Sequence, residues 1–122
     1  MISKITKQSL VIAIIGTAID QIYHIARSYP HQIFDITNQE TMYYIGLKFL
    51  IIIAVSWFAL NRLKQKAIAM SAIIGISSAF IFSVVVNYMY PNVYDISIHM
   101  LHAVGIAIGV YLTLTYKLEE KW

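Results

Sequence analysis

Long apolar segments alternate with short polar ones along the chain. The apolar segments cover about residues 10–28, 42–60, 67–89 and 95–116. Each is long enough to cross a bilayer as a helix, which needs about 20 apolar residues. Pro30, a basic turn at residues 61–66 and Pro91 separate them, and proline cannot continue a helix. The pattern predicts an all-α membrane protein, a four-transmembrane-helix bundle that forms one integral-membrane domain over residues 1–122.

Composition restricts the chain to a membrane environment. Hydrophobic residues make up 59% of the 122 residues, and charged residues only 12%. A soluble domain has about a quarter of its residues charged, so no soluble catalytic domain fits in what remains outside the spans. The absence of cysteine excludes disulfides, thiolate metal sites and thiol catalysis. The net charge of +3 does not indicate nucleic-acid binding, because the basic residues flank the apolar segments.

The basic residues give the expected orientation. With four spans, seven of the nine lysines and arginines fall on one side. Basic residues are enriched on the cytoplasmic side of membrane proteins. We therefore expect a multi-pass protein of the plasma membrane with both termini in the cytoplasm. The seven residues are Lys4, Lys7, Arg62, Lys64, Lys66, Lys117 and Lys121.

Ionisable residues inside the apolar segments are the candidate site, because such residues are costly in a membrane and are usually functional. Counted from the outer end of each span, Asp20, His24, Lys48, His99 and His102 share one layer in the outer half of the bilayer. Helical spacing places Asp20 and His24 on one helix face, and His99 and His102 on another. We expect these side chains to converge.

Several kinds of chemistry are open to this layer. In a structural arrangement, Lys48 and Arg27 neutralise Asp20 while the imidazoles form hydrogen bonds within the bundle. Alternatively, imidazole and carboxylate groups are ligands for copper or zinc, and a histidine pair from crossing helices can hold a haem. A proton or ion path through Asp20 or Lys48 is a further alternative. The candidate metal ligands are Asp20, His24, His99 and His102, and Lys48 is the expected intramembrane charge partner.

Small residues recur every four positions in the third and fourth spans. Such stripes allow membrane helices to approach closely, so these residues are predicted helix-packing positions. They are Ser71, Gly75 and Ala79 in the third span, and Gly105 and Gly109 in the fourth.

The architecture resembles a known family of small membrane subunits. The resemblance is based on the chain length, the lack of cysteine and two segments. These segments are Asp20-Gln21-Ile22-Tyr23-His24 and His99-Met100-Leu101-His102-Ala103-Val104-Gly105. The chain is similar in these respects to the AmoX-like small accessory subunit of archaeal ammonia monooxygenase. The resemblance covers the whole chain as architecture. It implies a membrane-embedded copper enzyme complex in which larger partner subunits carry the copper, and it transfers no catalytic residue to this chain.

The first functional hypothesis is therefore a non-catalytic accessory subunit of a multi-subunit membrane oxidoreductase. Such a subunit has other integral-membrane subunits and lipids as partners, has no nucleic-acid partner, and needs no cofactor of its own. The alternatives are a small metal- or haem-binding membrane protein that uses the intramembrane histidines and Asp20, and a small proton-coupled transporter.

Overall fold

The secondary structure is helical throughout the described part of the chain. The computed structural model describes residues 3–28, 39–89 and 102–121, with side chains for all of these except 23–28, 39–42, 44, 87 and 89. No strand occurs in these ranges, which confirms the all-helical prediction. The elements are α1 (Lys4–Ser28), α2 (Gln39–Arg62), α3 (Ala67–Met89), α5 (His102–Tyr116) and the 3₁₀ helix η1 (Leu118–Lys121).

Three of these helices are long and apolar enough to cross a membrane, over Lys4–Ile22, Ile45–Arg62 and Ala67–Val86. Helix α5 is a shorter apolar helix of 15 residues. Residues 95–101 of the predicted fourth span lie outside the described residues. Helix α3 has the predicted bounds, whereas α1 begins before its predicted apolar segment and α2 extends past both ends of its own. Hydropathy marks only the apolar part of a helix, and a helix can continue into polar sequence if its backbone is capped.

A polar side chain caps the start of α1, and another lies in the last turn of α2. At the start of α1, the backbone N–H of Thr6 donates to Ser3 Oγ over 3.2 Å, which makes Ser3 the N-cap residue. At the end of α2, the amide of Asn61 donates to the Trp57 carbonyl over 2.9 Å. Helix ends leave backbone groups without intrahelical partners, so Ser3 stabilises the start of α1. The Trp57 carbonyl lies one turn before the end of α2, where Asn61 adds a second donor to it, and the backbone N–H of Leu63 donates to the Ala59 carbonyl over 2.8 Å.

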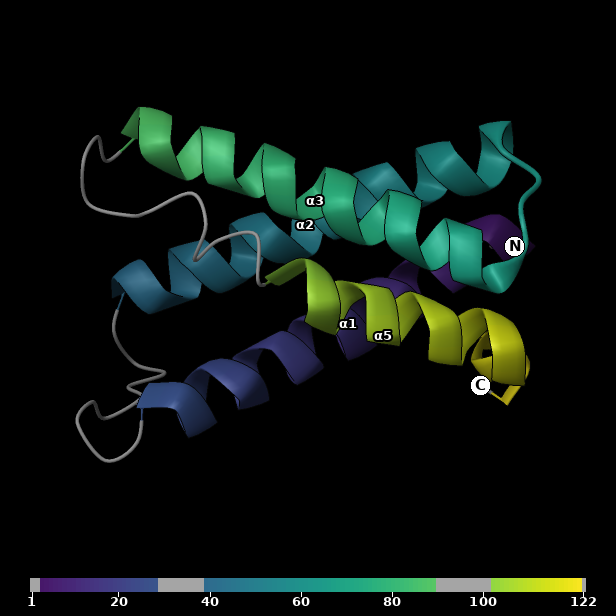
Figure 1. Cartoon of the computed structure of the whole chain (residues 1–122), viewed down its shortest axis with the longest axis horizontal. Helices are drawn as coiled ribbons and strands as arrows, with labels where there is room; N and C mark the ends of the chain where they lie inside the picture. Colours follow the sequence, from purple (N-terminus) through teal and green to yellow (C-terminus); the bar gives the residue numbers. More distant parts are fainter. Residues whose placement is uncertain (1–2, 29–38, 90–101, 122) are drawn as a thin grey trace.

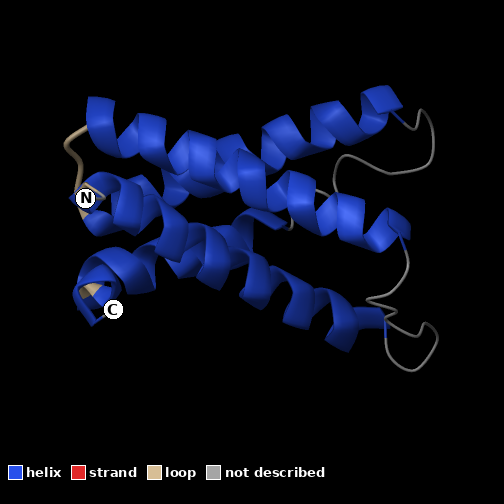
Figure 2. Ribbon diagram, turned by 180° about the vertical axis from the view of Figure 1, so that it is seen from behind, coloured by secondary structure: helices blue, strands red, loops and turns tan. Residues whose placement is uncertain are grey.

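The four α-helices of the described residues lie side by side as a bundle (Figure 1), and the view from behind shows the same arrangement (Figure 2). Helix α5 packs against α1 and α3, and α2 also packs against α1 and α3, which closes the ring. Both chain ends and the short α2–α3 connection lie at one end of the bundle. The core is built from all four helices and includes Ile12, Ile52, Ile74 and Ile106.

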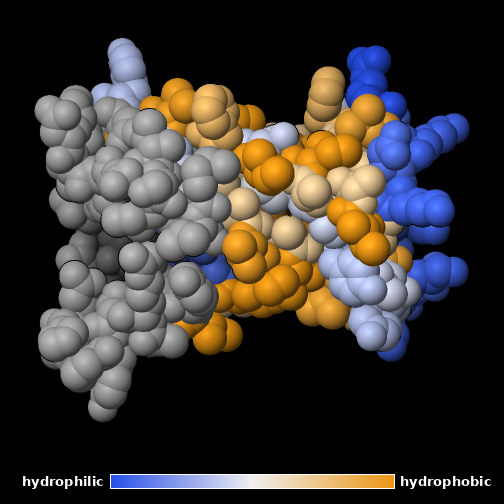
Figure 3. Space-filling view, viewed as in Figure 1, coloured by the Kyte–Doolittle hydropathy of each residue, from blue (hydrophilic) through white to orange (hydrophobic). Residues whose placement is uncertain are grey.

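The outer surface is apolar around the middle of the bundle. Figure 3 shows hydrophobic residues across this zone and hydrophilic residues gathered at the end that holds both termini. Exposed basic residues at this end include Arg62, Lys64, Lys66, Lys117 and Lys121. An apolar band beside a charged end is typical of a membrane-spanning bundle.

Glycines bring α5 close to its neighbours. A Cβ atom built on Gly109 would lie 2.8 Å from the backbone nitrogen of Gly16, and one on Gly75 would lie 2.8 Å from the carbonyl oxygen of Ala103. Real side chains do not fit at such distances, so glycine is required at both contacts. Ser71 and Ala79, the other small residues of α3 singled out above, are buried.

The chain end folds back onto α1. Lys117 follows α5 with a φ of 49°, which turns the backbone so that η1 packs against α1. Glu119 is then buried, and Gln8 Nε2 donates to Glu119 Oε1 over 3.1 Å. This contact fixes the C-terminal end of the chain near its beginning.

Candidate functional site

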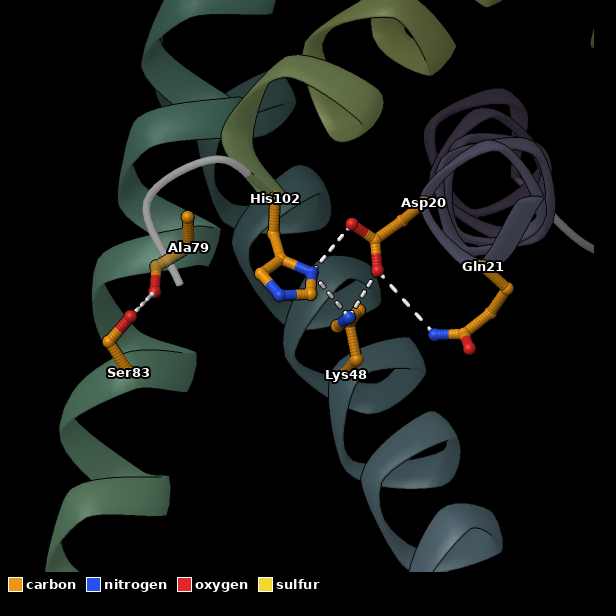
Figure 4. Close-up of polar contacts among 6 residues, drawn as sticks. All are labelled: Asp20, Gln21, Lys48, Ala79, Ser83 and His102. Atoms are coloured by element: carbon orange, nitrogen blue, oxygen red, sulfur yellow. Dashed lines mark hydrogen bonds and ion pairs between the residues drawn. The ribbon is translucent and has the colours of Figure 1, made fainter. Parts of the chain in front are cut away.

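Three ionisable side chains from three helices meet inside the bundle. Asp20 comes from α1, Lys48 from α2 and His102 from the first turn of α5 (Figure 4). Their exposed fractions are 2%, 3% and 9%. These three residues, called the ion cluster below, form the candidate site.

Close backbone packing between α1 and α5 positions two of the three side chains. A Cβ atom on Gly105 would lie 3.2 Å from both the Cα and the backbone nitrogen of Asp20. His102 precedes Gly105 by three residues and therefore lies on the same helix face. The glycine contact thus brings the His102 ring within reach of the Asp20 carboxylate.

Both oxygens of the carboxylate are engaged. The Lys48 ammonium donates to Asp20 Oδ2 as a buried ion pair. His102 Nδ1 lies 2.6 Å from Asp20 Oδ1 and 2.7 Å from Lys48 Nζ. Charge-assisted contacts at such distances are among the stronger hydrogen bonds in proteins, so the cluster joins α1, α2 and α5.

Helix α3 contributes an aromatic ring to the cluster. The Phe82 ring centroid lies 4.8 Å from Lys48 Nζ and 5.9 Å from the centroid of the His102 ring. A cation at this distance is attracted by the electron-rich face of the ring. Gln21 adds a long contact, with Nε2 at 3.5 Å from Asp20 Oδ2. All four helices therefore contribute side chains to the cluster or its immediate surroundings.

The cluster balances charge where charge is costly. An isolated charge near the centre of a membrane helix costs about 2.5–3.5 kcal/mol on insertion scales. When Asp20 is paired with Lys48, the net charge of the two side chains is zero. Removing one member of such a pair leaves a buried charge without compensation, which typically costs about 3–5 kcal/mol.

The structure brings together three of the residues selected from the sequence, namely Asp20, Lys48 and His102. His24 lies in the described helix α1, but its side chain and that of Arg27 are outside the described side chains. His99 lies outside the described residues altogether.

For a metal ion, the arrangement within the described residues is incomplete. No group of three histidine, aspartate or glutamate side chains comes together there. Asp20 and His102 converge, but the Lys48 ammonium contacts both and so occupies the position of a bridging cation. Binding by the four candidate ligands stays a prediction, since it depends on His24 and His99.

Some residues around the cluster were not selected from the sequence. Gly16 faces Gly109 directly, and Phe82 covers the ammonium and the imidazole. Gly16 lies four residues before Asp20, so the two residues share one face of α1. The sequence pattern does not predict the roles of Phe82 or, at the chain end, of Glu119, because only the tertiary packing gives them their neighbours.

Comparisons with known proteins identified no relative. No protein-family model matches the chain, and neither curated proteins nor solved structures gave a match. The function is therefore inferred from the geometry of this chain.

Proposed function

We propose that the chain is a non-catalytic accessory subunit that packs against other integral-membrane subunits of a membrane oxidoreductase. The similarity to the AmoX-like subunits of archaeal ammonia monooxygenase supplies the class of complex, a copper enzyme whose metal is held by the partner subunits. Four spans and cytoplasmic termini belong to the same proposal. Both termini, the α2–α3 connection and the exposed basic residues lie at the same end of the bundle. This arrangement supports the proposed orientation.

The outward face of α2 is the observation that carries the proposal. Gly46, Leu50, Ala54 and Trp57 are exposed and recur at helical spacing. We call these four residues the α2 stripe. Among the described residues, no atom lies within 4 Å of a Cβ built on Gly46.

Gly46 contrasts with the other glycines of this chain. Gly16, Gly75, Gly105 and Gly109 each have neighbouring backbone or side-chain atoms within 3.4 Å of the built Cβ. In this bundle, glycine therefore accompanies close helix packing, as is common in membranes. A glycine inside a helix is unfavourable by about 1 kcal/mol relative to alanine in soluble helices. A partner helix packed on the α2 stripe explains its presence at position 46.

The ion cluster supports a structural role for the interior. Asp20 and Lys48 compensate each other inside the bundle. Together with His102, this pair joins three helices, and the outer surface is left for lipids and partner subunits.

The experiment is co-purification of the native complex with a variant on the α2 stripe. Ala54→Leu adds three carbon atoms at an exposed position of α2. We expect the variant to insert and fold normally, because the new side chain points away from the core. Recovery of partner subunits, measured by mass spectrometry after gentle extraction, should fall at least roughly tenfold, since bulk in a close helix contact typically costs about 1–3 kcal/mol.

Ala72→Leu is the matched control, because Ala72 is an exposed alanine on α3. This variant should co-purify with the same subunits as the wild type. If Ala54→Leu and Ala72→Leu both retained the full set of partners, the α2 stripe would not be the docking face. If the wild-type chain purified without any partner subunit, the accessory role itself would be wrong.

A further inference from the structure

Helix α2 ends with a cation stacked on an aromatic ring. The guanidinium carbon of Arg62 lies 5.6 Å from the centroid of the Phe58 ring, which is one helical turn earlier in α2. Both side chains are exposed, Phe58 to 60%. A cation at this distance is attracted by the face of the ring. The contact therefore favours one position of the Arg62 charge on the outer surface of the bundle.

The pair lies where the apolar part of α2 ends. The segment that is long and apolar enough to cross a membrane covers Ile45–Arg62, and the exposed connection at residues 63–66 follows it. At a rise of about 1.5 Å per residue, Phe58 lies about 6 Å deeper along the helix axis than Arg62. With Arg62 at the level of the lipid headgroups, the ring is thus at the level of the upper acyl chains.

The charge of Arg62 has no carboxylate partner within the part of the chain that the structure describes. Both ion pairs found there involve Asp20, which is buried inside the bundle. Lys64 and Lys66 are also exposed, and the acidic residues of η1 pair with none of the three cations. The end of α2 and the connection after it therefore present three uncompensated positive charges, which are complementary to an anion.

We propose that Phe58 and Arg62, together with Lys64 and Lys66, form a binding site for an anionic phospholipid. These four residues are called the lipid site below. The planar guanidinium donates two hydrogen bonds to the phosphate group, a geometry that suits its fork of N–H groups. The two lysines attract the net negative charge of the headgroup. An acyl chain lies along the exposed Phe58 ring.

The order of the groups along α2 favours a lipid over an acidic protein surface. A phospholipid presents its phosphate directly above an apolar chain, as Arg62 lies directly above the exposed Phe58 ring. An acidic surface of a soluble protein matches the cations but leaves the ring without an apolar partner. Phe58 and Arg62 are not part of the α2 stripe, so the lipid site is independent of the accessory role and of the orientation in the membrane.

Native mass spectrometry of the full chain in a mild detergent tests the proposal. The probes are phosphatidylglycerol, which is anionic, and phosphatidylcholine with the same acyl chains, which has no net charge. We expect phosphatidylglycerol to bind at least about threefold more tightly, because the site is cationic. Inorganic phosphate at the same concentration should not displace it, since phosphate has no acyl chain. Equal affinity for both lipids, or displacement by inorganic phosphate, would overturn the proposal.

Variants at Arg62 separate the lipid site from the general charge of this end of the bundle. Arg62→Gln should lower the affinity for phosphatidylglycerol at least about threefold and leave that for phosphatidylcholine unchanged. Arg62→Lys keeps the charge but lacks the planar fork, so its affinity should fall at least about twofold. Lys121→Gln is the matched control, because Lys121 is an exposed cation of η1, which packs against α1 and α5. An equal loss of affinity in Arg62→Gln and Lys121→Gln would contradict a site at the end of α2.

The ring and the alternative partner are tested in the same assay. Phe58→Leu keeps an apolar side chain but removes the face on which the guanidinium is stacked, so the affinity for phosphatidylglycerol should fall at least about twofold. Unchanged affinity in this variant would rule out the stacked geometry. Binding of a polyglutamate peptide that is lost in Arg62→Gln, without any preference for phosphatidylglycerol, would assign the surface to an acidic protein instead. A failed co-purification experiment leaves these results unaffected, because they use the isolated chain.

Discussion

Among the described residues other than glycine, Lys117 alone has a positive φ. Its φ of 49° lies in the left-handed region, which costs a residue with a Cβ atom about 1–2 kcal/mol. Glycine is the usual residue at this position after a helix, since it adopts the conformation freely. Lys117 therefore holds the turn that brings Glu119 to Gln8 at a cost in stability.

Replacing Lys117 with glycine should stabilise the protein. We expect Lys117→Gly to raise the free energy of unfolding by up to about 1 kcal/mol, because the left-handed turn no longer strains a Cβ atom, while the greater freedom of glycine in the unfolded chain offsets part of the gain. Reversible unfolding in mixed detergent micelles measures the change. Lys117→Ala removes the same charge but keeps the Cβ atom and should give no gain. Equal stabilisation by both variants would assign the effect to charge.

The ion cluster was predictable at the residue scale only in part. Depth along each span placed Asp20, Lys48 and His102 in one layer, because helical rise is fixed at about 1.5 Å per residue. Depth does not give the rotation of a helix about its axis. The choice of His102 as the neighbour of Asp20 depends on the Gly105 contact, which exists only in the packed bundle.

At the scale of helices, hydropathy predicted the three long apolar helices of the described residues, but it did not predict which helices contact each other. The bounds of α3 agree with the sequence because basic residues border its apolar segment on one side. The pairing of Gly109 with Gly16 was not predictable, because small residues indicate close packing without naming the partner helix. The sequence does not predict the left-handed turn at Lys117 either, since no glycine stands at that position.

Gly109 and Gly46 provide a comparison between an internal and an external helix face. Gly109→Ala should destabilise the bundle by about 1–3 kcal/mol, because its Cβ would lie 2.8 Å from the Gly16 backbone nitrogen and α1 would have to move. Gly46→Ala meets no described atom within 4 Å and should be neutral or slightly stabilising in the isolated chain. Thermal unfolding of both variants in the same detergent measures this difference. Equal loss of stability would mean that the α1–α5 contact is looser than the structure shows.

At the scale of the whole molecule, charge and connectivity both support the proposed orientation. The exposed basic residues, both chain ends and the α2–α3 connection share one end of the bundle. On the face seen in Figure 3, apolar residues cover the middle of the bundle and hydrophilic residues gather at this end. From the positive-inside tendency we therefore propose that this end lies in the cytoplasm.

The lack of cysteine makes this orientation directly testable. A single introduced cysteine is the only thiol in the chain. Gln65→Cys in the α2–α3 connection should be protected from a membrane-impermeant maleimide in intact cells and should react after the cells are opened. Asp35→Cys, between the first two predicted spans, should react in intact cells. The opposite labelling pattern would reverse the orientation, and labelling of both positions from outside would contradict the four-span topology.

The ion pair between Asp20 and Lys48 also has a consequence for biosynthesis. The two residues are 28 positions apart, so α1 leaves the ribosome with its carboxylate before the compensating ammonium has been made. A lone charge makes insertion of a helix into lipid less favourable by about 2.5–3.5 kcal/mol. We therefore expect α1 to wait at the translocon until α2 arrives, so that the two helices enter the bilayer as one hairpin. The ion pair that stabilises the finished bundle is thus also expected to make α1 and α2 leave the insertion machinery together.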